Sequence, residues 1–148
     1  MSPIFEPGKS DFDELIEVWE TSVRATHDFL QESDIRWLRP QVRNEYFYAV
    51  RLYAFRNEDG KIQGFIGVAE GKIEMLFIAP TARGQGIGKK LLQYAVTILG
   101  ATELDVNEQN PQAVGFYLHQ GFEVVGRSPL DGMGKPFPLL HMKLSAVK

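Results

Sequence analysis

A short stretch of the sequence, TARGQGIGKKLL from Thr81 to Leu92, combines three glycines with three cationic side chains. It follows an apolar, strand-like segment and leads into apolar residues at helical spacing, so it lies at a strand-to-helix junction. The free N–H groups and the dipole of a helix N-terminus attract anions, and glycine lets the backbone approach a ligand closely. A glycine pair alone would favour a tight turn with solvated cations. Three glycines at such a junction instead indicate an anion site, most simply for a phosphate.

The glycine spacing does not match two common nucleotide-binding loops. A Walker-type loop has four residues between its glycine and a Gly-Lys pair, followed by a serine or threonine for magnesium. Here three residues separate Gly84 from Gly88, and Lys89 is followed by Lys90. A dinucleotide-binding loop needs a third glycine where this chain has Lys89. A nucleotide phosphohydrolase that binds ATP with magnesium is therefore disfavoured.

Two separated motifs resemble those of the GCN5-related N-acetyltransferase (GNAT) family. The first, R-x-x-G-x-G, runs from Arg83 to Gly88 after the strand-like LFIAP. The second, N-x-x-A-x-x-F-Y-x-x-x-G-F, runs from Asn110 to Phe122. Within that family, the segments DVNEQN, SVRATHDFL and GRSPLDGMGKPFPLL are similar to those of the small bacterial YjaB-type acetyltransferases. The likeness covers nearly the whole chain.

The resemblance implies one GNAT domain over residues 1–148, an α/β sandwich in which helices flank a mixed, splayed, largely antiparallel sheet. It implies that the strand Met75–Ile78 splays from the strand Leu104–Asn107, and that the acyl-pantetheine arm of acetyl-CoA lies in the gap. The amides from Gln85 to Lys89 would bind the pyrophosphate. The residues implied to contact the cofactor are Leu76, Phe77, Ile78, Arg83, Gly84, Gln85, Gly86, Ile87, Gly88, Lys89, Asn107, Asn110, Ala113, Phe116 and Tyr117.

The implied reaction moves an acetyl group from acetyl-CoA to a primary amine, in a small molecule or a protein lysine, by direct attack in a ternary complex. The resemblance gives Tyr117 the task of protonating the leaving thiolate. An aromatic residue on an amphipathic helix more often belongs to the core, but the place of Tyr117 inside the second motif favours the catalytic role. The chain has no cysteine, which excludes a cysteinyl acyl-enzyme. The competing hypothesis is a module of the same fold that binds acyl-CoA as a sensor, without turnover.

The general base stays open between two residues. A lysine amine, with a pKa of about 10.4, must lose a proton before it attacks. Glu74 is a carboxylate in an apolar strand, and some family members use a glutamate there directly or through water; a solvated outward residue is the equal alternative. His27 lies where related folds form a wall of the acceptor pocket, although a lone helical histidine is more often a core or capping group. His119 and His141 are assigned structural or surface roles.

Composition and charge narrow the partners and the location. The net charge of −3 argues against a nucleic-acid binder. No apolar run is long enough to span a membrane, and the first residues do not form a signal peptide, so we expect a cytoplasmic protein with no membrane partner. With no cysteine and three histidines at spacings unlike a zinc motif, we expect no metal. A homodimer is common in folds of this kind and is kept open.

The apolar pattern predicts the elements that must position these groups. Helices are expected over residues 10–30, from about residue 33 with a kink or break at Pro40, over 87–99 and over 111–120. Strands are expected over residues 3–7, 47–55, 61–69, 73–80, 101–107, 122–127 and 137–144, with a hairpin turn at Glu58–Gly60. The order β-α-α-β-β-β-α-β-α-β-β predicts a single α/β domain.

Overall fold

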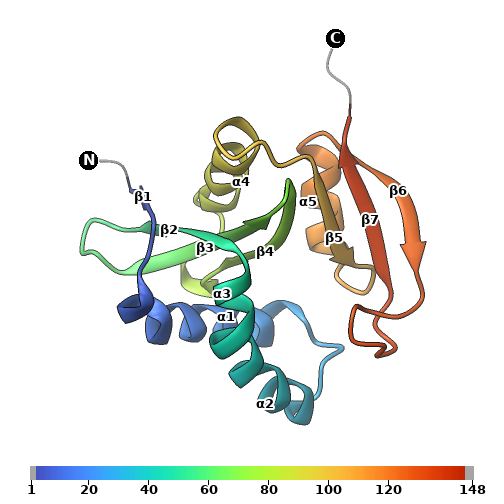
Figure 1. The fold of residues 1–148 in the computed structure, drawn as a ribbon, viewed down its shortest axis with the longest axis horizontal. Helices are drawn as coiled ribbons and strands as arrows, with labels where there is room; N and C mark the ends of the chain where they lie inside the picture. Colours follow the sequence, from blue (N-terminus) through green and yellow to red (C-terminus); the bar gives the residue numbers. More distant parts are fainter. Residues whose placement is uncertain (1–2, 146–148) are drawn as a thin grey trace. The chain divides into compact units, whose positions relative to one another are not determined.

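Figure 1 shows the computed structural model of the protein, which describes residues 3–145. The chain forms two compact units, Met1–Ala101 and Thr102–Lys148. The glycine-rich loop belongs to the first unit, and Tyr117 belongs to the second. The residues expected to act on the cofactor are therefore positioned by two different local folds.

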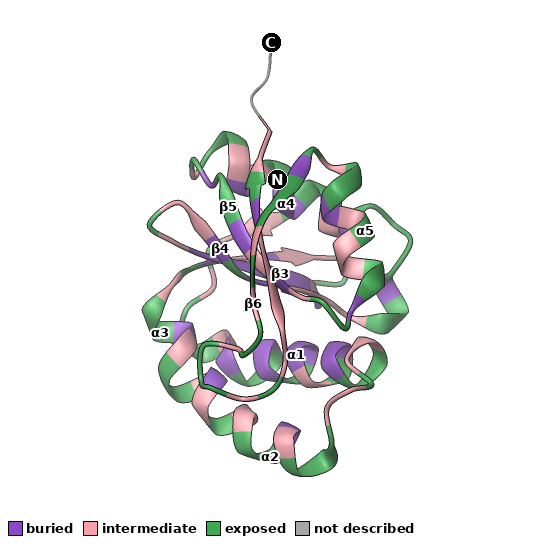
Figure 2. Cartoon of the chain, turned by 90° about the vertical axis from the view of Figure 1, so that its right-hand side faces the viewer, coloured by how far each residue is buried: buried purple, intermediate pink, exposed green. Residues whose placement is uncertain are grey.

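The first unit is an antiparallel sheet with helices on both faces. Its strands pair in chain order and are β1 (Ile4–Phe5), β2 (Arg51–Arg56), β3 (Ile62–Ala69) and β4 (Lys72–Ile78). Its α-helices are α1 (Phe12–Thr26), α2 (Glu32–Gln41), α3 (Phe47–Ala49) and α4 (Ile87–Thr97). Short 3-10 turns lie at Lys9–Asp11 and Pro80–Ala82, and a π-helical turn lies at Val42–Tyr46. Both α1 and α4 contact β3 and β4, from opposite sides of this sheet (Figures 1 and 2).

The second unit is a smaller antiparallel sheet with one helix. Its strands are β5 (Glu103–Asn107), β6 (Phe122–Ser128) and β7 (Leu139–Leu144), and its helix is α5 (Pro111–His119). Strand β7 pairs with both β5 and β6. Helix α5 contacts β5 and β6, so it covers one face of this sheet.

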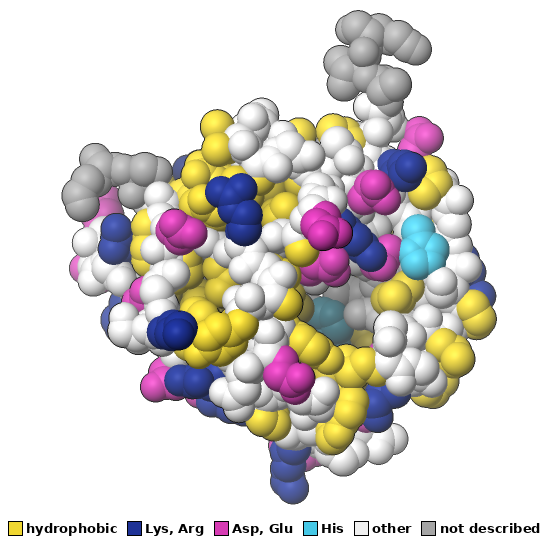
Figure 3. All heavy atoms as spheres, viewed as in Figure 1, with side chains coloured by type: hydrophobic (Ala, Val, Ile, Leu, Met, Phe, Trp, Pro, Cys, Tyr) yellow, Lys and Arg dark blue, Asp and Glu magenta, His cyan; other side chains and the backbone are white. Residues whose placement is uncertain are grey.

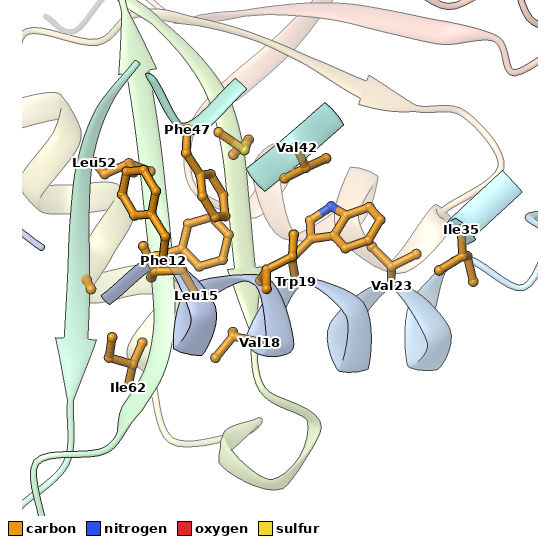
Figure 4. Close-up of a cluster of buried hydrophobic side chains, with 14 residues drawn as sticks. Phe12, Leu15, Val18, Trp19, Val23, Ile35, Val42, Phe47, Leu52 and Ile62 are labelled. Atoms are coloured by element: carbon orange, nitrogen blue, oxygen red, sulfur yellow. The ribbon is translucent and has the colours of Figure 1, made fainter. Parts of the chain in front are cut away.

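The core of the first unit lies between α1 and the sheet. Side chains of Phe12, Trp19 and Val23 project from α1 into it (Figure 4). The ring of Phe47 packs edge-on against Phe12 and Phe65, with centroids 5.2 and 5.6 Å apart. Figure 2 shows buried residues along β3, β4 and α1. Burial of each large apolar side chain contributes about 1.5–3 kcal/mol, and this packing fixes β4.

The predicted order of helices and strands is confirmed. The hairpin turn at Glu58–Gly60 forms as expected, because Gly60 adopts a φ angle of 80° and the side chain of Asn57 accepts from the N–H groups of Asp59 and Lys61, each at 2.9 Å. The two last strands also pair as expected.

Several predicted boundaries differ from the structure by two residues or more, and three regions are the most informative. The expected strand 47–55 begins only at Arg51, because Phe47 is drawn into the core as part of α3. Helix α1 ends at Thr26 rather than Leu30. Helix α2 ends at Gln41, directly after Pro40, and the helical path continues as the π-helical turn Val42–Tyr46, so the bonding changes there but the path is not broken.

Candidate active site

The glycine-rich loop between β4 and α4 has a backbone that glycine adopts most readily. Gly84 and Gly86 have φ angles of 82° and 77°, in the left-handed region that disfavours side chains. Gly86 is also the N-terminal cap of α4. A Cβ atom on either glycine would meet no other atom within 4 Å. Backbone conformation rather than crowding therefore requires these glycines, and the space around them is open.

The loop presents a row of backbone N–H groups without acceptors. Within residues 3–145, none of the amides from Gln85 to Lys89 donates a hydrogen bond, whereas Lys90 donates to the carbonyl of Gly86 at 3.0 Å. No side chain caps this end of α4. Arg83 and Lys89 are exposed beside the row. Together with the helix dipole, worth about half a positive charge, these amides can bind phosphate oxygens.

Strand β4, which leads into the loop, is bulged at Glu74. Met75 pairs with Gly67 and Ile73 pairs with Val68, so Glu74 has no partner on β3. Its side chain is exposed and forms no ion pair with a residue in the described range 3–145. Bulges redirect side chains and are frequent beside active sites.

Beyond the bulge, alternate backbone groups of β4 point away from β3. The N–H of Ala79 donates to the carbonyl of Gln63, on β3, at 2.8 Å. Successive residues of a strand direct their N–H and C=O groups to opposite edges. The backbone N–H and C=O groups of Phe77 therefore point toward β3, whereas those of Leu76 and Ile78 point toward the other edge of β4. An N–H group at either position is suited to polarise a carbonyl oxygen.

His27, directly after α1, is a half-buried and uncharged imidazole. Burial lowers the pKa of His27 from 6.5 to about 4, although the carboxylate of Asp28 acts in the opposite direction. The hydroxyl of Thr26 donates to the carbonyl of Ser22 at 2.8 Å and lies 2.7 Å from Nδ1 of His27. Because this hydroxyl has one proton, it accepts from Nδ1, and Nε2 keeps its lone pair. The ring of His27 lies near that of Phe77 on β4, with centroids 6.2 Å apart.

In the second unit, Asn110 begins helix α5. Its Oδ1 accepts from the N–H of Ala113 at 3.2 Å, and Pro111 in the first turn has no N–H to satisfy. The N–H of Asn110 donates to the carbonyl of Asn107, the last residue of β5, at 3.0 Å. The buried Asn110 side chain thus fixes the turn from β5 into α5.

Tyr117 lies on α5 with a buried ring. The ring packs edge-on against Phe116 and Phe122, with centroids 5.3 and 6.1 Å apart. Burial raises the pKa of the phenol, so the hydroxyl keeps its proton at neutral pH. Within residues 3–145 this hydroxyl forms no hydrogen bond, yet no fully buried side-chain oxygen lacks a partner. The oxygen must therefore contribute to the 8% of the residue that is exposed, where it can donate its proton.

The predicted site residues thus fall into two groups. Those of the first unit are Glu74, Leu76, Phe77, Ile78, Arg83, Gly84, Gln85, Gly86, Ile87, Gly88 and Lys89 on β4, the loop and the start of α4, with His27 near β4. Those of the second unit are Asn107, Asn110, Ala113, Phe116 and Tyr117 on β5, α5 and the turn between them. The first group offers mainly backbone donors, and the second mainly side chains.

One cluster of three polar side chains was not predicted from the sequence. Asp105, His141 and Ser128 form a row of hydrogen bonds across the second unit's sheet. They are far apart in the sequence and match no motif. The signal that could have found them is strand alternation, which places polar residues of neighbouring strands on the same face.

The surface drawn in Figure 3 mixes acidic and basic side chains rather than gathering one sign. This face therefore lacks the continuous basic stripe typical of nucleic-acid binders. Within residues 3–145, no helix combines the length and apolar character that crossing a bilayer requires. The same residues contain no group of three or more histidine, cysteine, aspartate or glutamate side chains placed to hold a metal ion.

Curated relatives match most of the chain. The peptidyl-lysine N-acetyltransferase YjaB of Salmonella typhimurium is 43% identical over 130 residues, which cover 88% of this chain and 89% of that protein. The protein of the same name from Escherichia coli is 41% identical and covers 88% of both chains. Because the identity extends over most of both chains, it is much stronger evidence of relatedness than the two short motifs alone.

Solved structures match the fold. The apo form of YjaB from Escherichia coli, solved in solution, aligns with a TM-score of 0.87 at 37% identity and covers 97% of each chain. The PaiA N-acetyltransferase of Thermoplasma acidophilum, crystallised in complex with coenzyme A, aligns with a TM-score of 0.75 at 23% identity, over 96% of this chain and 98% of that one. At that identity the second likeness shows the fold alone. The expected α/β fold class is confirmed.

The family expectation is tested most directly by a family model. The model for the acetyltransferase (GNAT) domain matches residues 30–145, which include both motifs. With the named relatives, this match confirms the predicted acetyl-CoA-dependent N-acetyltransferase. The chain belongs to the GCN5-related N-acetyltransferase (GNAT) family.

Proposed function

We propose that this protein acetylates the side-chain amine of lysine residues in peptides or proteins, by direct attack of the amine on acetyl-CoA in a ternary complex. The names of the two YjaB relatives, at 43% and 41% identity, support this acceptor. The observation that carries the proposal is the row of N–H groups from Gln85 to Lys89 at the start of α4, since it offers a pyrophosphate several donors at once.

The loop has the task of binding and orienting the cofactor. Acetyl-CoA supplies the acetyl thioester. The amides of Gln85 to Lys89 bind its pyrophosphate, and the exposed cations Arg83 and Lys89 add attraction. The backbone groups of Leu76 and Ile78, directed away from β3, pair with the pantetheine arm and polarise the thioester carbonyl.

Tyr117 acts as the general acid. Its raised pKa keeps the phenol protonated at neutral pH, so it is a donor and not a base. A proton delivered to the departing sulfur avoids the release of a free thiolate. General acid catalysis of this kind contributes about 10²–10⁴-fold to a rate.

Glu74 and His27 serve the acceptor amine. A pKa of about 4 makes His27 a weak base, but its Nε2 lone pair can accept a hydrogen bond from the amine and orient it. The exposed carboxylate of Glu74, at the bulge of β4, then takes the proton directly or through a water molecule.

The remaining predictions concern organisation. We propose that the two units work as one domain over residues 1–148, which the family match supports because residues 30–145 include parts of both. Action in the cytoplasm, the absence of a metal and the absence of nucleic-acid binding stay predictions, and a homodimer stays open.

The test is release of free CoA from acetyl-CoA with a panel of amines: a lysine peptide, the same peptide with lysine replaced by arginine, a peptide with only an α-amine, and spermidine. We expect turnover with the lysine peptide and none with its arginine counterpart. Turnover with spermidine and not with the lysine peptide would mean that the acceptor is a polyamine and not a lysine side chain. If the protein binds acetyl-CoA but forms no free CoA with any of these amines, the sensor hypothesis would be supported instead.

A further inference from the structure

Three polar side chains share one face of the second unit's sheet. Asp105 on β5 lies directly opposite His141 on β7. Their neighbours Leu104, Val106 and Met142 are buried on the other face. Since side chains alternate between faces, Asp105 and His141 both project from the face opposite to these apolar residues.

The imidazole of His141 also lies beside β6, the third strand of this sheet. His141 pairs with Gly126 on β6, and a bulge at Val125 precedes this pair. A Cβ atom on Gly126 would lie 3.4 Å from Cδ2 of His141, in van der Waals contact, so the imidazole lies directly over this glycine. Ser128, two residues further along β6, lies on the same face and within reach of the ring.

The resulting hydrogen bonds have a defined direction. Nδ1 of His141 lies 2.6 Å from Oδ1 of Asp105, and Nε2 lies 2.6 Å from Oγ of Ser128. A carboxylate only accepts hydrogen bonds, so Nδ1 carries the proton. In the neutral ring Nε2 then accepts from the hydroxyl of Ser128. This is the order that activates a serine: a base on the hydroxyl, and a carboxylate that holds the base.

We propose that Asp105, His141 and Ser128 form a second reactive site, in which Ser128 is a nucleophile for small activated acyl esters and thioesters. Oγ of Ser128 attacks the carbonyl carbon while Nε2 of His141 takes its proton. The bond to the leaving alcohol or thiol breaks, and the leaving group takes that proton. Water, deprotonated by Nε2, then cleaves the serine ester, releases the carboxylic acid and returns the proton to Oγ.

The network is accessible to such reagents. The side chain of His141 is 36% exposed and that of Asp105 is 23% exposed, and Ser128 is half-buried. Asp105 is a positioning residue, because it touches His141 and not the reacting atoms. A positioned base contributes about 10²–10⁴-fold, so we expect Ser128 to react at least about 10²-fold faster than an unassisted serine.

The chain contains a matched control serine. Oγ of Ser145 donates to a carboxylate oxygen of Glu123 at 2.9 Å, and within residues 3–145 it has no hydrogen bond to an imidazole. The purified protein, without acetyl-CoA or amine, is incubated with a fluorophosphonate probe, and peptide mass spectrometry follows labelling of both serines over time. Comparison within one folded molecule removes any dependence on how variants fold.

We expect labelling of Ser128 at least about 10²-fold faster than that of Ser145. His141→Gln should remove most of this excess and Asp105→Asn should reduce it, whereas Ser145→Ala should leave the labelling rate of Ser128 unchanged, with circular dichroism confirming each fold. The same ranking is expected for hydrolysis of p-nitrophenyl acetate. Equal labelling of the two serines, or labelling of Ser128 that survives His141→Gln, would overturn the proposal. Neither readout involves acetyl transfer to an amine, so each is independent of the proposed function.

Discussion

The candidate functional groups of the two units are of different kinds. In the first, the candidate groups are backbone amides from Gln85 to Lys89, held by the left-handed glycines Gly84 and Gly86. In the second, they are side chains, above all that of Tyr117, whose ring is set by aromatic neighbours. A substitution in the second unit can remove the functional group itself. A substitution in the first unit leaves the backbone amides in place and affects them only if it changes the backbone conformation. The size of mutational effects should therefore separate the two regions.

The largest effect is expected in the second unit. Tyr117→Phe keeps the buried ring and removes only the proton donor, so kcat should fall by about 10²–10⁴-fold. The KM for acetyl-CoA should change little, because the phenol is assigned to the leaving group and not to the pyrophosphate. Steady-state kinetics with a lysine peptide measure both. A wild-type kcat for Tyr117→Phe would contradict the comparison, because the side chain of Tyr117 would then not be essential to the second unit.

His27 is a half-buried side chain of the first unit whose pKa the fold lowers. Its pKa of about 4 in the folded state, against 6.5 when unfolded, means that the unfolded chain binds the extra proton first as pH falls. The associated stability is therefore complete above pH 6.5 and lost as the pH falls toward 4, by about 3 kcal/mol in all.

Urea unfolding of wild type and His27→Gln at pH 7 and pH 4.5 tests this assignment. The variant should lose less stability than the wild type between the two values. If His27→Gln shows the same loss as the wild type, His27 is not buried in its neutral form.

The glycines of the loop should give an intermediate effect. Gly84→Ala places a side chain in the left-handed region, at about 1–2 kcal/mol, and the loop can relieve this strain by misaligning its amides. We expect the Kd for CoA, measured by calorimetry, to rise about 5–30-fold. Gly60→Ala creates the same strain at a φ angle of 80° in the β2–β3 turn, so it should lower stability without changing this Kd. Equal Kd values for the two variants would contradict the role of the loop.

The smallest effect is expected for the exposed cations. Lys89→Ala removes a charge next to the row of amides, and an exposed charge pair contributes about 0.2–1 kcal/mol. The Kd for CoA should therefore rise less than about sixfold, and the difference from wild type should shrink in high salt. Lys143→Ala, on β7, is the matched control. A loss larger than that of Gly84→Ala would show that side chains dominate the first unit too.

The sequence predicted what depends on local chemistry. The loop could be recognised because positive φ angles require glycine at Gly84 and Gly86, wherever the rest of the chain lies. Phe47 was misassigned to a strand because its contacts with Phe12 and Phe65 come from distant segments and outweigh its own strand propensity.

The polar row in the second unit shows the same limit. His141 lies 36 residues from Asp105 and 13 from Ser128, and only the pairing of three strands brings them together. The pKa of His27 could not be predicted either, since burial by the fold sets its value.

The central claim, that backbone amides of the first unit bind the pyrophosphate, is tested most directly by NMR. In a ¹⁵N-labelled protein titrated with CoA, the amide signals of Gln85 to Lys89 should shift together and saturate with one Kd, and those of the Gly60 turn should stay in place. Saturable CoA binding that leaves these amide signals unmoved would contradict the account.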